Sequence, residues 1–150
     1  MSKEIEAQRM TAEIYHGSAT CKQKFQELLD EFAVPRCVFP VAEVESAEFE
    51  ELGFNGATGF FWILQKAKTV RKMSKTSMIF YSVEVTGFIK ERHLSKITGV
   101  KGKEGMFTLP ILELIIDCPT AGKVKCVATA GLGRTSPLAD YQKAAEYALR

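Results

Sequence analysis

The sequence has little of the chemistry that metal sites and disulfide frameworks require. Its four cysteines are scattered without a Cys-x-x-Cys pair, and its two histidines, His16 and His93, lie far from any cysteine pair. Structural zinc sites use closely spaced cysteine and histidine ligands. We therefore expect free, packed thiols, no metal site and no cofactor.

The sequence also lacks a long apolar run. Segment 1–17 holds no unbroken apolar stretch of signal-peptide length, and no window approaches the length of a membrane span. These absences predict a soluble protein of the cytoplasm. With 150 residues, of which 46% are hydrophobic and 25% charged, the chain fits one globular domain over residues 1–150.

Two catalytic motifs are missing. Gly99, Gly102 and Gly105 lack the spacing of a phosphate-binding loop, and they precede an apolar run instead of following a strand and opening a helix. We interpret them as turn residues that precede a strand of the core. No Gly-x-Ser-x-Gly sequence, the motif of hydrolase nucleophiles, occurs in the chain.

A catalytic triad without a sequence motif stays open, because triads are defined by geometry. The candidate base is His93, with Asp117 or Asp140 to orient it. His93 lies in the polar run KERHLSK, where a solvent-facing histidine is the more ordinary interpretation. We therefore expect binding rather than catalysis.

Charge is distributed unevenly along the chain, although the net charge is only +2. Segment 27–51 holds eight acidic residues and one arginine, a net of −7, whereas segment 66–103 holds ten basic and two acidic residues, a net of +8. These segments either pair within the domain or leave a basic patch for an anionic partner such as a membrane surface. The candidate patch consists of Lys66, Lys68, Arg71, Lys72, Lys101 and Lys103. Aromatic residues do not alternate with these cations, so we expect no nucleic acid.

Apolar residues recur at helical spacing in one segment near the N-terminus. Thr20 and Gln23 fit a capping box, and Pro35 marks the end of the helix. The apolar stripe consists of Cys21, Phe25, Leu28, Leu29 and Phe32. Segment 3–15 is compatible with a further helix, and the alanine-rich segment 140–150 predicts a short, weakly held one.

The rest of the chain has the pattern of short strands. Asn55-Gly56 predicts a two-residue hairpin, and strands are expected over 59–65, 78–89, 107–116 and 123–130. The first of these strands is apolar on both faces and must be covered on both. Pro110 predicts an edge position or a bulge in the third.

One helix followed by antiparallel strands, without helical crossovers, predicts a fold class. We expect a mainly β (α+β) protein in which a small, barrel-like, bent antiparallel sheet carries a packed N-terminal amphipathic helix.

Five segments of the chain carry a family pattern. They are TAEIYHG (11–17), ATGFFWILQKAK (57–68), YSVEVTGFI (81–89), LSKITGVKGKE (94–104) and GLGRTSPLADYQ (131–142). In order and spacing the chain resembles the plant family called domain of unknown function 538, in its intracellular branch without a signal peptide. The resemblance covers a core of about residues 11–142 and implies a β-barrel-like sheet with an N-terminal helix.

The resemblance also implies candidate functions. Family members have been compared with lipid-binding bactericidal/permeability-increasing proteins, linked to lipid or chlorophyll binding, and proposed as ester hydrolases, without roles for particular residues. Two segments depart from the family pattern. The loop after the main helix reads AVPRCVFP where GLPxGLLP is usual, and GMFTLP lacks the usual tryptophan-containing centre.

Three functions follow from these observations. The leading hypothesis is a non-enzymatic module that binds a lipid-like or pigment-like amphipathic ligand, with Trp62, Phe60 and Phe107 as candidate ligand-binding residues. The alternatives are a carboxylesterase-like hydrolase that uses His93, and a stress-response module that binds other proteins through its charged segments.

Overall fold

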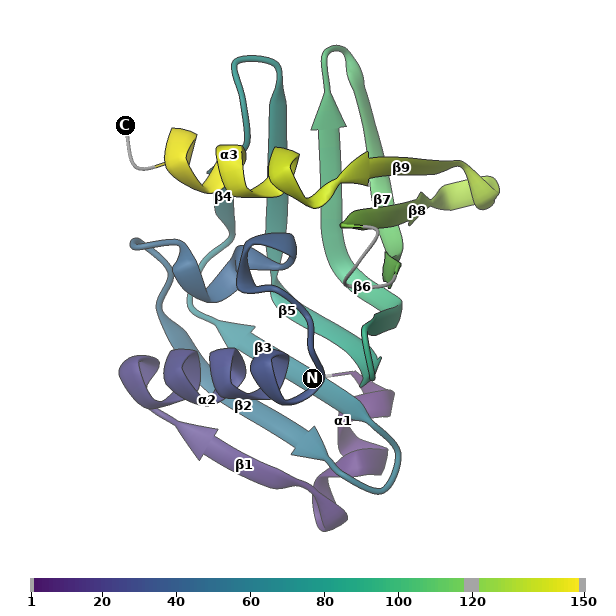
Figure 1. The fold of residues 1–150 in the computed structure, drawn as a ribbon. Coiled ribbons are helices and arrows are strands. Elements are labelled where there is room, and N and C mark those ends of the chain that lie inside the picture. Colours follow the sequence, from purple (N-terminus) through teal and green to yellow (C-terminus); the bar gives the residue numbers. More distant parts are fainter. Residues whose placement is uncertain (1, 118–121, 149–150) are drawn as a thin grey trace.

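A computed structural model of the chain describes residues 2–117 and 122–148. Their dominant element is one antiparallel sheet of nine strands (Figure 1). The strands are β1 (Glu13–His16), β2 (Phe49–Asn55), β3 (Phe60–Gln65), β4 (Thr69–Lys72), β5 (Ser77–Lys90), β6 (His93–Glu104), β7 (Phe107–Asp117), β8 (Lys123–Ala128) and β9 (Gly133–Pro137). Their spatial order is β1-β2-β3-β5-β6-β7-β8-β9, and β4 pairs with the first part of β5.

Helical segments flank this sheet. They are α1 (Lys3–Gln8), α2 (Ser18–Glu31), α3 (Leu138–Ala148) and the short 3-10 turns η1 (Arg9–Thr11), η2 (Arg36–Val38), η3 (Pro40–Glu43) and η4 (Thr129–Gly131). The predicted fold class, a mainly β antiparallel sheet with an N-terminal helix, is therefore confirmed. The sheet stays open, however, because β1 and β9 end the strand order and do not pair with each other among the described residues.

The sheet has two halves that share β5 and β6 (Figure 1). In the first half, β1, β2 and β3 lie beside the C-terminal part of β5. In the second half, β4, β7, β8 and β9 surround the N-terminal part of β5 and the C-terminal part of β6. Helix α2 packs on β1 and β2, whereas α3 contacts β4, β9 and η2.

The first half of the sheet is covered on both faces, as the apolar pattern of β3 requires. Phe61 and Ile63 face the main core, to which α2 contributes Phe25 and Leu29. The alternate residues of a strand point to the opposite face, and there Phe60 and Trp62 pack with Ile5 of α1. Two helical segments, rather than a barrel wall, thus bury this strand.

The predicted capping box at the start of α2 is wrong. Helix α2 begins at Ser18 with Gly17 as its N-cap, so Thr20 lies in the first turn and forms no capping box. The side chain of Ser18 instead accepts a hydrogen bond from the backbone N–H of Phe49 at 3.1 Å. This contact ties the start of the helix to the start of β2.

The hairpin between β2 and β3 is longer than the predicted two-residue turn. Asn55 pairs with Phe60, so the four residues 56–59 connect the strands, and the positive φ of +82° falls on Gly59. The Asn55 side chain donates to Gln8 and Thr11 at 2.7 Å and accepts from the backbone N–H of Ala57. Asn55 therefore anchors the N-terminal segment instead of occupying a turn position.

The interpretation of Gly99 and Gly102 as turn residues is also wrong, because both lie inside β6 and only Gly105 lies in the turn before β7. Gly99 has a φ of +81°, and a Cβ atom there would lie 2.2 Å from the backbone oxygen of Glu84. A Cβ atom on Gly102 would lie 3.1 Å from Cδ1 of Ile111. These glycines allow close approach within the sheet.

Pro110 lies in an interior strand, because β7 pairs with both β6 and β8. The predicted edge position is therefore wrong. Pro110 itself pairs in register with Lys101 of β6, and the register with β8 shifts just after it, between Ile111 and Glu113.

The close approach at Gly99 generates a stability prediction. Gly99→Ala places a methyl group against a backbone oxygen at positive φ, so we expect it to lower the free energy of unfolding by about 3 kcal/mol or more. Gly105→Ala is the matched control, because its φ of +58° is also positive but nothing lies within 4 Å of the added carbon. It is expected to cost about 1 kcal/mol. Urea unfolding measures both, and equal losses would contradict the packing role of Gly99.

Candidate functional site

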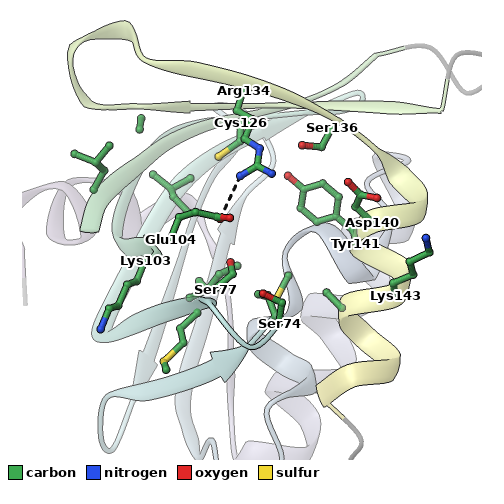
Figure 2. A pocket seen from close by; sticks show the side chains of 18 of the residues that line it. Ser74, Ser77, Lys103, Glu104, Cys126, Arg134, Ser136, Asp140, Tyr141 and Lys143 are labelled. Atoms are coloured by element: carbon green, nitrogen blue, oxygen red, sulfur yellow. Dashed lines mark ion pairs between the residues drawn. The ribbon is translucent and has the colours of Figure 1, made fainter. Parts of the chain in front are cut away.

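A cavity of about 870 Å³ lies between α3 and the second half of the sheet in the described part of the chain (Figure 2). Its walls come from β4–β5, β6–β7, β8–β9 and α3. Because these elements are far apart in sequence, the cavity exists only when the sheet and α3 have assembled.

The inner walls of the cavity are mainly apolar. They include Met78, Ile79, Leu109, Ile111, Leu132 and Ala144. Hydroxyl groups of Ser74, Ser77, Ser136 and Tyr141 interrupt this surface. Apolar walls with a few polar groups are typical of small-molecule sites, which measure roughly 300–1,000 Å³.

Charged residues lie around the rim. Arg134 of β9 and Glu104 of β6 form an ion pair of 3.2 Å between the two sides of the cavity, and both side chains are more than half exposed (Figure 2). An exposed pair of this kind contributes roughly 0–1 kcal/mol. The ion pair therefore connects the two walls of the cavity only weakly.

Two groups that line the cavity, Tyr141 and Cys126, keep their protons at physiological pH. Burial raises the pKa of Tyr141 to about 12, so its hydroxyl group keeps its proton. Burial also raises the pKa of the Cys126 thiol, although Arg134 opposes this shift. A protonated thiol is a poor nucleophile, so Cys126 contributes to the wall of the cavity rather than to covalent chemistry.

A second, smaller cavity of about 40 Å³ shares Ile79, Ile111, Cys126 and Tyr141 with the first. Tyr81 lines it, is 1% exposed, and its hydroxyl group has no hydrogen-bond partner among the described residues. Burial raises the pKa of Tyr81. The neutral hydroxyl group of Tyr81 thus lies beneath the residues that separate the smaller cavity from the larger one.

The three predicted ligand-binding residues lie elsewhere. Phe60 and Trp62 are buried together beneath α1, with ring centroids 6.0 Å apart. Phe107 is 77% exposed at the start of β7. The structure brings Phe60 and Trp62 together but places none of the three among the residues that line the cavity.

The predicted basic patch is divided by ion pairs. Lys66 pairs with Glu48 at 3.1 Å, and the buried Arg71 pairs with Glu43 at 3.4 Å. The acidic and basic segments therefore pair in part within the domain. The remaining four members, Lys68, Lys72, Lys101 and Lys103, form no ion pair within residues 2–117 and 122–148, and Lys103 also reaches the cavity.

The candidate catalytic residues form no triad among the described residues. His93 contacts Glu113 of β7 through a short hydrogen bond, and it does not line the cavity. Asp117 ends β7, but its side chain lies outside the described part of the chain, as does Cys118. Asp140 lies on α3 and lines the cavity, whereas His93 of β6 and Glu113 of β7 do not line it.

The described residues form neither a metal site nor a membrane-spanning helix. No group of three or more histidine, cysteine, aspartate or glutamate side chains is arranged to hold a metal ion within those residues. None of the helices described there is long and apolar enough to cross a membrane.

A family model described as "Protein of unknown function, DUF538" matches residues 25–142. The chain belongs to this family. No curated protein and no solved structure matches it. The DUF538 range contains β2 to β9 and the first turn of α3, and so most of the cavity wall, whereas α1 and β1 precede it.

Sequence reasoning missed the contribution of α3 to the cavity of this DUF538 chain. A signal was present: Leu138, Tyr141 and Ala144 recur every three residues, which places them on one face of a helix. Leu138 and Tyr141 pack against the main core, and Ala144 is buried. The other walls join through long-range strand register, for which the sequence carries no comparable local signal.

Glu51 holds the N-terminal segment onto the first half of the DUF538 sheet. Its buried carboxylate accepts hydrogen bonds from Arg9 at 2.5 Å, Trp62 at 2.8 Å and His16 at 3.0 Å. Burial alone would raise the pKa of Glu51, but these three donors outweigh it and lower the pKa below its ordinary value. The carboxylate explains why a tryptophan nitrogen is tolerated in an otherwise apolar cluster.

This arrangement predicts acid sensitivity. Because the pKa of Glu51 is lower in the folded state, its stabilisation is fully present above the unfolded pKa of about 4.3 and is lost as the pH falls through the folded pKa. Glu51→Gln is expected to lower the free energy of unfolding by roughly 1–3 kcal/mol at neutral pH, and this difference is expected to shrink in acid.

Glu48→Gln is the matched control, since it removes a carboxylate from an exposed ion pair just before the same strand. It is expected to cost less than about 1 kcal/mol. Urea titrations from neutral pH to about pH 3 compare the variants. A Glu51→Gln deficit that does not change with pH would contradict the account.

Proposed function

We propose that this chain is a non-enzymatic binding module for a lipid-like or pigment-like amphipathic molecule. The apolar part of the ligand lies between α3 and the second half of the sheet, and its polar end lies at the rim. The observation that carries the proposal is the cavity of about 870 Å³ with mainly apolar walls and neutral inner hydroxyl groups.

The shape and chemistry of the cavity support an amphipathic ligand rather than a fully polar one. A polar molecule would lose its hydration against Ile79, Leu109 and Ile111 without finding enough partners. An apolar chain gains roughly 25 cal/mol for each Å² removed from water there. Lys143 at the rim supplies donors for a head group with oxygen acceptors.

The same site gives less support to ester hydrolysis. No histidine lines the cavity within the described part of the chain, and the half-buried Cys126 thiol stays protonated. His93 hydrogen bonds to Glu113, and no serine, threonine or cysteine described here hydrogen bonds to it. A base without a neighbouring nucleophile favours binding over catalysis.

The third hypothesis, a stress-response interaction module, depends on free charged segments. Lys66 and Arg71 pair with Glu48 and Glu43, so part of that charge is satisfied inside the domain. The cavity therefore favours a small amphipathic ligand over a charge-guided protein partner.

A blocked cavity provides the test. Ser77 lies at the start of β5, lines the cavity, and its hydroxyl group makes no hydrogen bond to a described residue. Ser77→Trp is expected to fill the cavity and weaken binding of dansyl-labelled undecanoic acid by roughly tenfold or more, because overpacking costs about 1–3 kcal/mol. Fluorescence titration of the purified full chain measures the affinity.

Thr135→Trp is the matched control. Its neighbours Arg134 and Ser136 line the cavity, so strand alternation points Thr135 away from it. This variant is expected to bind as the unmodified chain does. Equal binding by both tryptophan variants, or no binding by the unmodified chain, would overturn the cavity as the ligand site.

A further inference from the structure

The turn between β6 and β7 carries large apolar side chains that face solvent. Met106 is 95% exposed and Phe107 is 77% exposed, and Leu109 of the same hairpin is 37% exposed. The hairpin projects beyond the helices at the top of Figure 1. The backbone N–H of Gly105 donates to Thr76 at 2.8 Å, so the β4–β5 turn supports it. Adjacent exposed apolar residues on a supported turn are typical of an interaction site.

Below this tip, the strand register places lysines side by side on one face of the sheet. Lys72 of β4 pairs with Met78, which pairs with Lys103, which pairs with Thr108. The next parallel row is Val70, Phe80, Lys101 and Pro110. Directly paired residues of antiparallel strands share a face. These two rows, which we call the outer face, hold three lysines and no acid.

Most of the outer face lies opposite the cavity. The alternate residues Ile79, Gly102 and Ile111 line the cavity beneath α3, and among the residues of the outer face only Met78 and Lys103 also reach it, so the face as a whole points away from that helix. Lys72 and Lys101 are exposed, and Val70 keeps 46% of its surface exposed. The lysines of the outer face form no ion pair within the described part of the chain. The face is therefore both cationic and partly apolar.

We propose that the hairpin tip and the outer face dock on an anionic lipid bilayer. Met106 and Phe107 enter the boundary between head groups and acyl chains, and Lys72, Lys101 and Lys103 contact the lipid phosphates and carboxylates. Apolar burial and cationic attraction act together at such surfaces, because neither alone gives stable attachment. This proposal rests on the tip and the outer face, not on the cavity.

Charge favours a bilayer over a second copy of the chain. A symmetric dimer through this surface would place the same three lysines against each other, and like charges in direct apposition are unfavourable. An anionic bilayer offers the opposite charge to the lysines and an apolar interior to the tip. Docking in this way also brings the cavity rim close to the bilayer, since Glu104 and Leu109 flank the tip and line the cavity.

The test uses the full chain with two sets of vesicles, one of equimolar phosphatidylcholine and phosphatidylserine and one of phosphatidylcholine alone. Cosedimentation is expected only with the first set and is expected to weaken as salt rises. Lys72→Glu with Lys101→Glu is expected to reduce partitioning by at least roughly twentyfold, because each lysine contributes about fivefold. Met106→Ser with Phe107→Ser is expected to reduce it by roughly tenfold or more.

Lys24→Glu with Lys90→Glu is the matched control. It makes the same change in net charge on α2 and at the far end of β5, and it is expected to leave partitioning within about twofold of the unmodified chain. Phe107→Trp reports contact of the tip with the bilayer through its fluorescence, because the native Trp62 is buried. Its emission is expected to shift to the blue with anionic vesicles.

Three results would overturn the proposal. The first is equal partitioning into the two sets of vesicles, and the second is a charge-reversed outer face that partitions as the control does. The third is a dimer in sedimentation velocity without vesicles that is lost in Met106→Ser with Phe107→Ser, which would assign the tip to a second copy. Ser77→Trp is expected to lose fatty acid binding and to keep vesicle binding. The proposed cavity site and the proposed docking surface can therefore be refuted separately.

Discussion

The backbone of Gly99 passes directly against the carbonyl oxygen of Glu84, and the division of the sheet into two halves depends on this approach. The φ of +81° at Gly99 and the 2.2 Å that would separate a Cβ atom from that oxygen leave room for glycine alone. At the same level the β5–β6 register shifts between Tyr81 and Thr86. Both strands therefore change direction while they remain paired.

The two halves that result are packed differently. The first half is closed on both faces, by α2 on one and by α1 on the other, and the Glu51 carboxylate fixes Arg9 and Trp62 there. The second half carries α3 at a distance that leaves the cavity. A first half that is closely packed on both faces is thus combined with a second half that has internal space and an exposed hairpin.

Local sequence patterns predicted the elements that local physics determines. The spacing of Phe25, Leu28 and Leu29 gave the buried stripe of α2, and the two-sided apolar pattern of β3 gave a strand covered on both faces. Gly99 was interpreted as a turn residue, because its requirement for glycine comes from Glu84, fifteen residues away, as the numbering shows. The cavity was not predicted for the same reason. Its walls come from segments far apart in the sequence, which meet only through strand pairing and the packing of α3.

Methyl NMR of the full chain, titrated with undecanoic acid, tests the central claim most directly. The account predicts that the methyl signals of Ile79, Leu109 and Ile111, which line the cavity, shift together in a saturable manner. Those of Ile63 and Leu52, buried in the first half, are expected to stay unchanged. Saturable shifts confined to the first half, or no shifts at any of these methyl groups, would contradict a ligand site between α3 and the sheet.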